Sequence, residues 1–156
     1  MGEPTPTAPT ELRQGSQLAL LLKTMRPKQW TKNVFVWAAL IFDVKLFAPV
    51  WFVRTLVAFV LFCLISSAVY IINDLVDVPR DRLHPAKRNR PLASGALSPR
   101  LAIIAAIVII VGCLPAALAI GWPLTLILYG YLLLMVAYSF YLKHIVIVDV
   151  LAIALG

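Results

Sequence analysis

Three aspartates follow an apolar run at a spacing that suits a metal ion. Residues 55–72 carry no formal charge, and directly after them come Asn73, Asp74, Asp77 and Asp81. On a continuous helix, positions i, i+3 and i+7 share one face, so the three carboxylates would repel one another unless a cation lay between them. Carboxylate oxygens beside substrate phosphates are typical surroundings of Mg²⁺ in proteins. The spacing therefore predicts a magnesium site formed by Asp74, Asp77 and Asp81.

Two other interpretations of the same acids stay open. Pro79 cannot donate a backbone hydrogen bond and disfavours the α conformation of the residue before it. The helix could then end at Asp77, which would act as the N-cap of a new turn. A solvated loop with weak surface ion pairs would also account for the charges. The N-cap interpretation explains Asp77 but leaves Asp74 and Asp81 without a role.

A basic segment follows the acids within a few residues. Lys87, Arg88 and Arg90 lie in a stretch that is rich in proline. Ammonium and guanidinium groups beside carboxylate-bound Mg²⁺ would form a binding site for a diphosphate. His84 is a candidate general base, although we expect it to be a turn residue. Acids for a metal and bases for phosphate suggest that a diphosphate is cleaved at a membrane surface beside a lipid partner.

Polar residues at two other places are candidates for the same site. Lys32 and Asn33 lie near the start of one apolar segment, and Tyr138 and Lys143 lie near the end of another. Polar groups at membrane depth normally face the interior of a helical bundle. Lys143 could equally be a topology anchor, and Asp149 is its candidate partner. The predicted substrate-binding residues are Asn73, Lys32, Asn33, Lys87, Arg88, Arg90, Tyr138 and Lys143.

The elements that must position these residues are predicted to be membrane-spanning helices. Of the 156 residues, 62% are hydrophobic and 13% are charged, whereas soluble domains carry about 25% charged residues. The mean hydropathy is +0.91. We therefore predict an all-α fold, a polytopic transmembrane helical bundle. Cys63 and Cys113 lie inside apolar runs and are predicted to be packing residues, not a disulfide or a metal pair.

Four complete spans and one shorter segment are predicted, because a crossing takes about 20 mainly apolar residues. The four complete spans are residues 27–43, 55–77, 99–120 and 122–142. Ser98 is the expected N-cap of the third, ahead of a proline in its first turn. The fifth segment, 145–156, would cover only about 18 Å of a hydrocarbon layer about 30 Å thick. We expect the chain to be the N-terminal part of a larger bundle, with a re-entrant terminal helix as the alternative.

Charge predicts the orientation of the bundle. Residues 1–16 are polar, rich in Pro and Thr and without the apolar region of a signal peptide, so we predict a disordered cytoplasmic tail ahead of a transmembrane domain at 17–156. Residues 11–32 hold five Lys or Arg, and residues 73–100 hold six. By the positive-inside rule, the N-terminus and the 73–98 loop face the cytoplasm of a multi-pass protein in the plasma (inner) membrane. No nucleic-acid partner is expected.

The acids and bases together resemble a known family. Asn73-Asp74-x-x-Asp77-x-x-x-Asp81 is similar to the first aspartate-rich motif, NDxxDxxxD, of the UbiA superfamily of intramembrane prenyltransferases, and the similarity continues through HPAKRNRPLASG. Within the superfamily, RPKQWTKN, DVPRDRLHPAKRNRP and YSFYLKHIVIVDV most resemble the decaprenyl-phosphate phosphoribosyltransferases of actinobacterial-type cell envelopes. The resemblance covers residues 22–156.

The resemblance implies a nine-helix bundle whose central cavity opens to lipid. It implies two aspartate-rich motifs that hold Mg²⁺ and a diphosphate, of which this sequence contains the first. The implied reaction transfers a 5-phosphoribosyl group from phosphoribosyl diphosphate to decaprenyl phosphate, in the synthesis of cell-wall arabinan precursors. Lys87, Arg90 and Lys143 would bind phosphate oxygens. The acceptor phosphate is already ionised, so no general base is nominated, and we expect the 156-residue chain alone to be inactive.

Two other functions stay open. An enzyme that moves an isoprenyl chain from its diphosphate to an aromatic acceptor would use the same acids, and the diphosphate consumed would distinguish the two. A half-length bundle could instead be a dimerising transporter or an assembly subunit. In that case Asp74 and Asp149 would be ion ligands.

Overall fold

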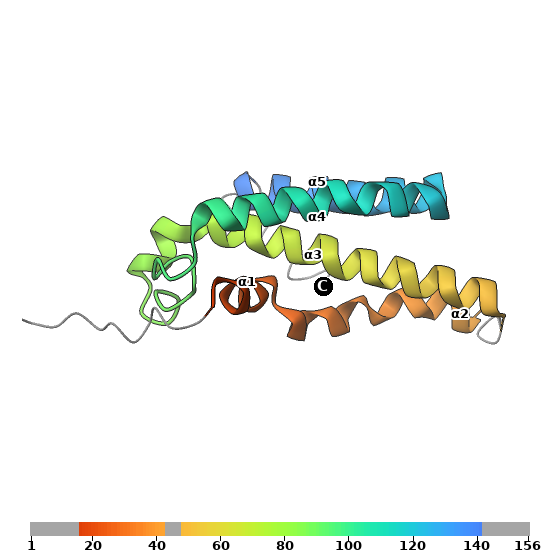
Figure 1. Ribbon diagram of the computed structural model, residues 1–156, viewed down its shortest axis with the longest axis horizontal. Coiled ribbons are helices and arrows are strands. Elements are labelled where there is room, and N and C mark those ends of the chain that lie inside the picture. The colour runs from red at the N-terminus through yellow and green to blue at the C-terminus, as the bar shows by residue number, and fades with distance from the viewer. Residues whose placement is uncertain (1–15, 43–47, 142–156) are drawn as a thin grey trace, which may run out of the picture.

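The computed structural model describes residues 16–42 and 48–141, and within these ranges every regular element is a helix. The elements are α1 (Gln17–Met25), the 3₁₀ helix η2 (Pro27–Trp37), α2 (Ala38–Phe42), α3 (Pro49–Leu83), α4 (Pro99–Ile120) and α5 (Trp122–Phe140). Helices α3, α4 and α5 pack against one another along the long axis of the molecule, and η2 and α2 run along the other side of α3 (Figure 1). The predicted all-α fold is confirmed for the described residues.

Three of the helices are long and apolar enough to cross a membrane, namely α3, α4 and α5. Helix α4 has the predicted bounds, 99–120, and Ser98 occupies its N-cap position, although the serine hydroxyl makes no capping hydrogen bond. Gly121, at φ 152°, separates α4 from α5, and few residues other than glycine adopt that conformation. Helix α5 was predicted for 122–142 and extends to Phe140.

The first predicted span, 27–43, differs from the structure. Its first eleven residues form η2, and only five residues of α-helix follow in α2. The polar start of the segment, with Lys28, Lys32 and Asn33, leaves it without a long apolar run. The count of four complete spans is therefore not confirmed, and three span candidates stand among the described residues. The 145–156 segment and the 1–15 part of the predicted tail lie outside them.

Helix α3 continues through Pro79 to Leu83, well past the predicted end of the span near Asp77. Asp77 is therefore an interior helical residue, and the interpretation of Asp77 as an N-cap is wrong. Proline within a helix removes one backbone hydrogen bond and costs about 3 kcal/mol. The helix nevertheless continues past Pro79. Its last turn carries Asp81, which is 3% exposed and ion-paired with Arg90.

The short helix α1 was not predicted. Ser16 caps it, because the Ser16 hydroxyl accepts a hydrogen bond from the Ala19 N–H at 3.2 Å. Helix α1 is seen nearly end-on in Figure 1 while α3 lies across the picture, so α1 crosses the long helices instead of running along them. Its buried residues Leu21 and Met25 join a core cluster at the end of the bundle where α3 carries its acids.

A second core cluster holds the middle of the three long helices together. It includes Leu61 and Ile65 of α3, Cys113 of α4 and Leu128 of α5. Cys63 and Cys113 are both buried thiols that are not paired in a disulfide, which confirms their predicted packing role. The site described next lies beyond this cluster, toward the end of α3.

Candidate functional site

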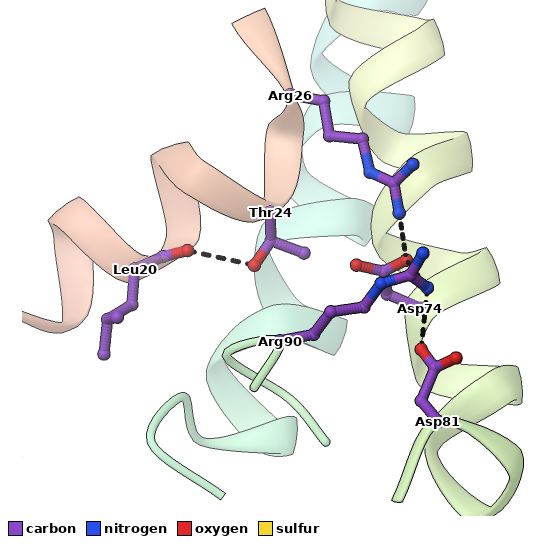
Figure 2. Close-up of polar contacts among 6 residues, drawn as sticks. All are labelled: Leu20, Thr24, Arg26, Asp74, Asp81 and Arg90. Atoms are coloured by element: carbon purple, nitrogen blue, oxygen red, sulfur yellow. Dashed lines mark hydrogen bonds and ion pairs between the residues drawn. The ribbon is translucent and has the colours of Figure 1, made fainter. Parts of the chain in front are cut away.

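Two of the three predicted aspartates are buried and ion-paired at the end of α3. Asp74 and Asp81 are 4% and 3% exposed. Arg90 Nη1 lies 2.7 Å from Asp81 Oδ2 and 3.3 Å from Asp74 Oδ1, so one guanidinium nitrogen joins the two acids. Arg26 Nη2 lies 2.7 Å from the same Asp74 oxygen. Figure 2 shows the two arginines converging on the acids from different parts of the chain.

Asp74 and Asp81 share a face of α3, as their spacing predicts, whereas the predicted magnesium site stays a prediction. They are seven residues apart, two turns of a helix, and both are buried on the same side of α3. The cation in this structure is the Arg90 guanidinium. Asp77, one turn beyond Asp74, is half-buried, so the third acid is more open to solvent than the other two.

Arg26 is positioned by a sharp turn between α1 and η2. It is the only non-glycine residue with positive φ in the described ranges, at φ 53° and ψ 59°. The residue before a proline is pushed out of the right-handed α region, so Pro27 helps to end α1 at this point. The Arg26 guanidinium also lies 4.9 Å from the centre of the Tyr70 ring, a cation–π contact from the same face of α3.

Arg90 is positioned by the loop between α3 and α4, which folds back on the bundle. Leu92 and Leu97 of the loop are 2% and 0% exposed and belong to the core cluster that includes α1. Arg82 Nε donates a hydrogen bond to the Ala93 carbonyl at 3.1 Å. Arg90 is therefore held beside the acids by the buried leucines that follow it in the loop and by its ion pairs with α3.

Helix α1 also clamps this loop through one side chain. Gln17 Nε2 donates to the Ala96 carbonyl at 2.8 Å, and the Ser98 N–H donates to Gln17 Oε1 at 3.1 Å. Both the nitrogen and the oxygen of the Gln17 side-chain amide therefore form hydrogen bonds with the loop backbone. The loop that carries Arg90 and the helix that precedes Arg26 are thereby held together.

The other predicted basic residues do not reach the buried acids. Lys87 and Arg88 lie in an exposed turn after α3, and Lys32 is exposed on η2. No ion pair joins any of these three to Asp74 or Asp81 in the part of the chain that the structure describes. His84 is exposed, and its Nδ1 accepts a hydrogen bond from the Ala86 N–H at 3.2 Å, as expected of a turn residue.

Asn33 faces α3, but away from the acids. Its amide nitrogen lies 3.4 Å from both Cys63 Sγ and Ser66 Oγ, and Trp30 Nε1 donates to Ser67 Oγ at 3.0 Å. These contacts attach η2 to the middle of α3. The remaining predicted residues are Asn73 and Tyr138, which are half-buried, and Lys143, which with Asp149 lies outside the described residues.

Arg26 is a candidate site residue that sequence reasoning missed, since it was only counted among the five Lys or Arg of residues 11–32. Its ion pair spans 48 positions, a separation that no local pattern predicts. The signal in the sequence is the order of residues: a short apolar helix, then arginine, then proline. A cation fixed in a turn beside an acid-bearing span is a candidate partner for those acids.

The donor set at this site is compatible with a divalent cation. Within residues 16–42 and 48–141, no three His, Cys, Asp or Glu side chains come close enough together to share one metal ion. Asp74 and Asp81 nevertheless present oxygens within 3.3 Å of one point, the Arg90 Nη1 atom. Two carboxylates, with further ligands from substrate phosphates and water, are a usual donor set for Mg²⁺.

Comparison with known proteins gives several relatives that share one name. The chain is 39% identical over 141 residues to a decaprenyl-phosphate phosphoribosyltransferase of Mycobacterium tuberculosis, which covers 88% of this chain and 47% of that relative. Proteins of the same name from Mycolicibacterium smegmatis and Corynebacterium glutamicum are 37% and 36% identical, over 99% and 87% of this chain and 48% and 42% of the relatives. The chain thus spans about half the length of these relatives.

The family profile agrees with these relatives. The UbiA prenyltransferase family matches residues 33–156, which include α3 with its acids and the loop that carries Arg90. The chain belongs to the UbiA prenyltransferase family.

Proposed function

We propose that the protein transfers a 5-phosphoribosyl group from phosphoribosyl diphosphate to decaprenyl phosphate or a similar polyprenyl phosphate. The relatives that carry this activity in their names support the choice of substrates. The observation that supports the site is the meeting of Asp74 and Asp81 at one Arg90 nitrogen, with Arg26 on the other side. We place the reaction in the plasma membrane, in the synthesis of cell-wall arabinan precursors.

The two arginines are suited to bind a diphosphate. Their side chains are 31% and 27% exposed, whereas the acids they contact are nearly buried, so the positive groups form the accessible part of the cluster. Guanidinium groups form paired, charge-assisted hydrogen bonds with phosphate oxygens. A bound diphosphate would therefore be held by Arg26 and Arg90, with Lys87 and Arg88 on the exposed turn nearby adding positive charge.

Mg²⁺ would be held by Asp74 and Asp81, with Asp77 one turn away, and would neutralise charge on the departing diphosphate. The acceptor phosphate oxygen forms a bond to the anomeric carbon of the ribose, and the bond from that carbon to the diphosphate oxygen breaks. The acceptor is already ionised, so no side chain needs to remove a proton. The arginines would hold the diphosphate so that the bond to the anomeric carbon faces the lipid phosphate.

The proposal includes the rest of the bundle. We propose that η2 and α2 together form a first span beside the span candidates α3, α4 and α5. Tyr138, near the end of α5, would then lie at the same cytoplasmic end as the 73–98 loop. The chain spans about half the length of these relatives, and the proposed site includes the second acidic motif that the family resemblance implies.

The test is an assay of the complete gene product in lipid vesicles with Mg²⁺. Radiolabelled phosphoribosyl diphosphate and decaprenyl phosphate are supplied in one arm, and an isoprenyl diphosphate with an aromatic acceptor in the other. We expect label in the lipid fraction in the first arm only. Arg90→Gln should abolish that transfer, while the matched control Arg88→Gln on the exposed turn should reduce it only slightly.

Two results would overturn the proposal. Consumption of the isoprenyl diphosphate without phosphoribosyl transfer would identify the protein as a prenyltransferase acting on an aromatic acceptor. Absence of both reactions in a correctly inserted protein, together with a stable dimer that moves an ion, would favour the transporter.

A further inference from the structure

We propose that α1 lies in the plane of the membrane surface and contacts lipid through Leu18 and Leu22. These two leucines are 65% and 46% exposed, in a helix of only nine residues. They are four residues apart and therefore form one row along the helix surface. This row contacts the bilayer that the long helices cross, at the boundary between its acyl chains and its head groups.

The order of residues around α1 divides the helix into three faces. Leu21 and Met25 point into the protein core, and the Leu18–Leu22 row is next to them. A further step around the helix, Ala19 and Lys23 are exposed on the side away from the core. A helix with protein on one side, an apolar row on the next and a charged residue beyond it has the arrangement of an interfacial helix.

The direction of α1 agrees with this placement. Figure 2 shows the helix that carries Leu20 and Thr24 running across the direction of α3, and Figure 1 shows the same crossing from another side. A helix that runs across the spans lies along the membrane surface. The exposed apolar row therefore extends along the surface of the bilayer.

The depth of α1 is also suitable. Leu21 and Met25 share a core cluster with Ala102, which lies in the first turn of the α4 span candidate. The helix therefore sits at the level where α4 begins. Lys23 in its last turn and Lys28 just beyond it are exposed and would meet acidic head groups at that level.

With this placement, α1 would also help to position the site, whichever substrate the protein uses. Gln17 binds the backbone of Ala96 and Ser98. A helix anchored in the interface would therefore fix the depth of the loop that carries Arg90, close to the level at which lipid phosphates lie.

Spin labels on α1 test the proposal directly. Single cysteines are introduced by Leu18→Cys, Leu22→Cys, Ala19→Cys and Lys23→Cys in the complete gene product, in a background without other reactive cysteines. The labelled protein is placed in vesicles of phosphatidylethanolamine and phosphatidylglycerol. Power saturation then compares the collision rate of each label with oxygen, which concentrates in lipid, and with a water-soluble nickel chelate.

We expect the labels at 18 and 22 to collide more with oxygen, and the labels at 19 and 23 to collide more with the nickel chelate. Equal exposure of all four labels to the nickel chelate would place α1 in water and overturn the proposal. Labels at 18 and 22 that are immobile and shielded from both reagents would show that protein, not lipid, covers this row, which also overturns it. Neither result would affect the phosphoribosyl transfer assay.

Discussion

Removing the Arg90 guanidinium should destabilise the folded protein more than removing any charge on the neighbouring exposed turn. Arg90→Met keeps most of the aliphatic volume and removes the positive group. Asp81 would then stay 3% exposed without its bridging partner, whereas Asp74 would keep Arg26 at 2.7 Å. The energetic cost should therefore come mainly from Asp81.

The size of the effect follows from the burial of the two partners. Breaking a buried ion pair by removing one partner costs about 3 to 5 kcal/mol. The Arg90 side chain is 27% exposed, and water can reach part of the space that it leaves. We therefore expect a loss of about 2 to 3 kcal/mol in the free energy of unfolding. Arg88→Met, on the exposed turn, should stay within about 0.5 kcal/mol of the unmodified protein.

The measurement is unfolding of the complete gene product by SDS in mixed micelles, followed by tryptophan fluorescence. Adding Asp81→Asn to Arg90→Met should recover at least about 1 kcal/mol, because the unpaired charge is then gone. An Arg90→Met protein as stable as the Arg88→Met control would refute the reasoning. An additive double variant would show that Asp81 and Arg90 are not energetically coupled, which would also refute it.

Three further outcomes are expected. Leu97→Ala should destabilise the protein by about 2 to 4 kcal/mol in the same SDS titration, because Leu97 is fully buried, whereas Leu83→Ala at an 88% exposed position should have little effect. Gln17→Ala should speed hydrogen exchange of the Ser98 amide, measured by mass spectrometry, and unchanged exchange would contradict the clamp. Asp77→Asn should abolish phosphoribosyl transfer while membrane insertion, measured by fractionation, is unchanged; normal turnover would exclude a metal-binding role.

The parts of the fold that were predicted well are those with local signals at both ends. Helix α4 begins directly after Ser98 and ends directly before Gly121, and both its bounds were predicted correctly. Helix α3 carries a misleading local signal, because Pro79 suggests an end that the structure does not have. The helix continues past Pro79, and Asp81 beyond it is buried and ion-paired with Arg90.

The parts that were not predicted depend on contacts between distant segments. The 3₁₀ conformation of η2 accompanies side-chain contacts with α3, such as Trp30 to Ser67, 37 positions apart. The pairing of Arg26 with Asp74 spans 48 positions. Spacing alone indicated that a cation must lie between the acids. It could not indicate that an arginine from a loop would lie there.

At the end of α3, the acidic and the basic partners of the ion pairs belong to different kinds of secondary structure. Asp74 and Asp81 are on one continuous helix, so their separation is set by helical geometry. Arg26 and Arg90 come from a turn and a loop, attached to the bundle by buried leucines and by Gln17. The two acids and the two arginines balance in charge, which lowers the energetic cost of burying the carboxylates at the end of an apolar helix. Because the arginines are the more exposed members, the diphosphate of the proposed reaction would meet them first, and the carboxylates would then be left to a cation that accompanies it.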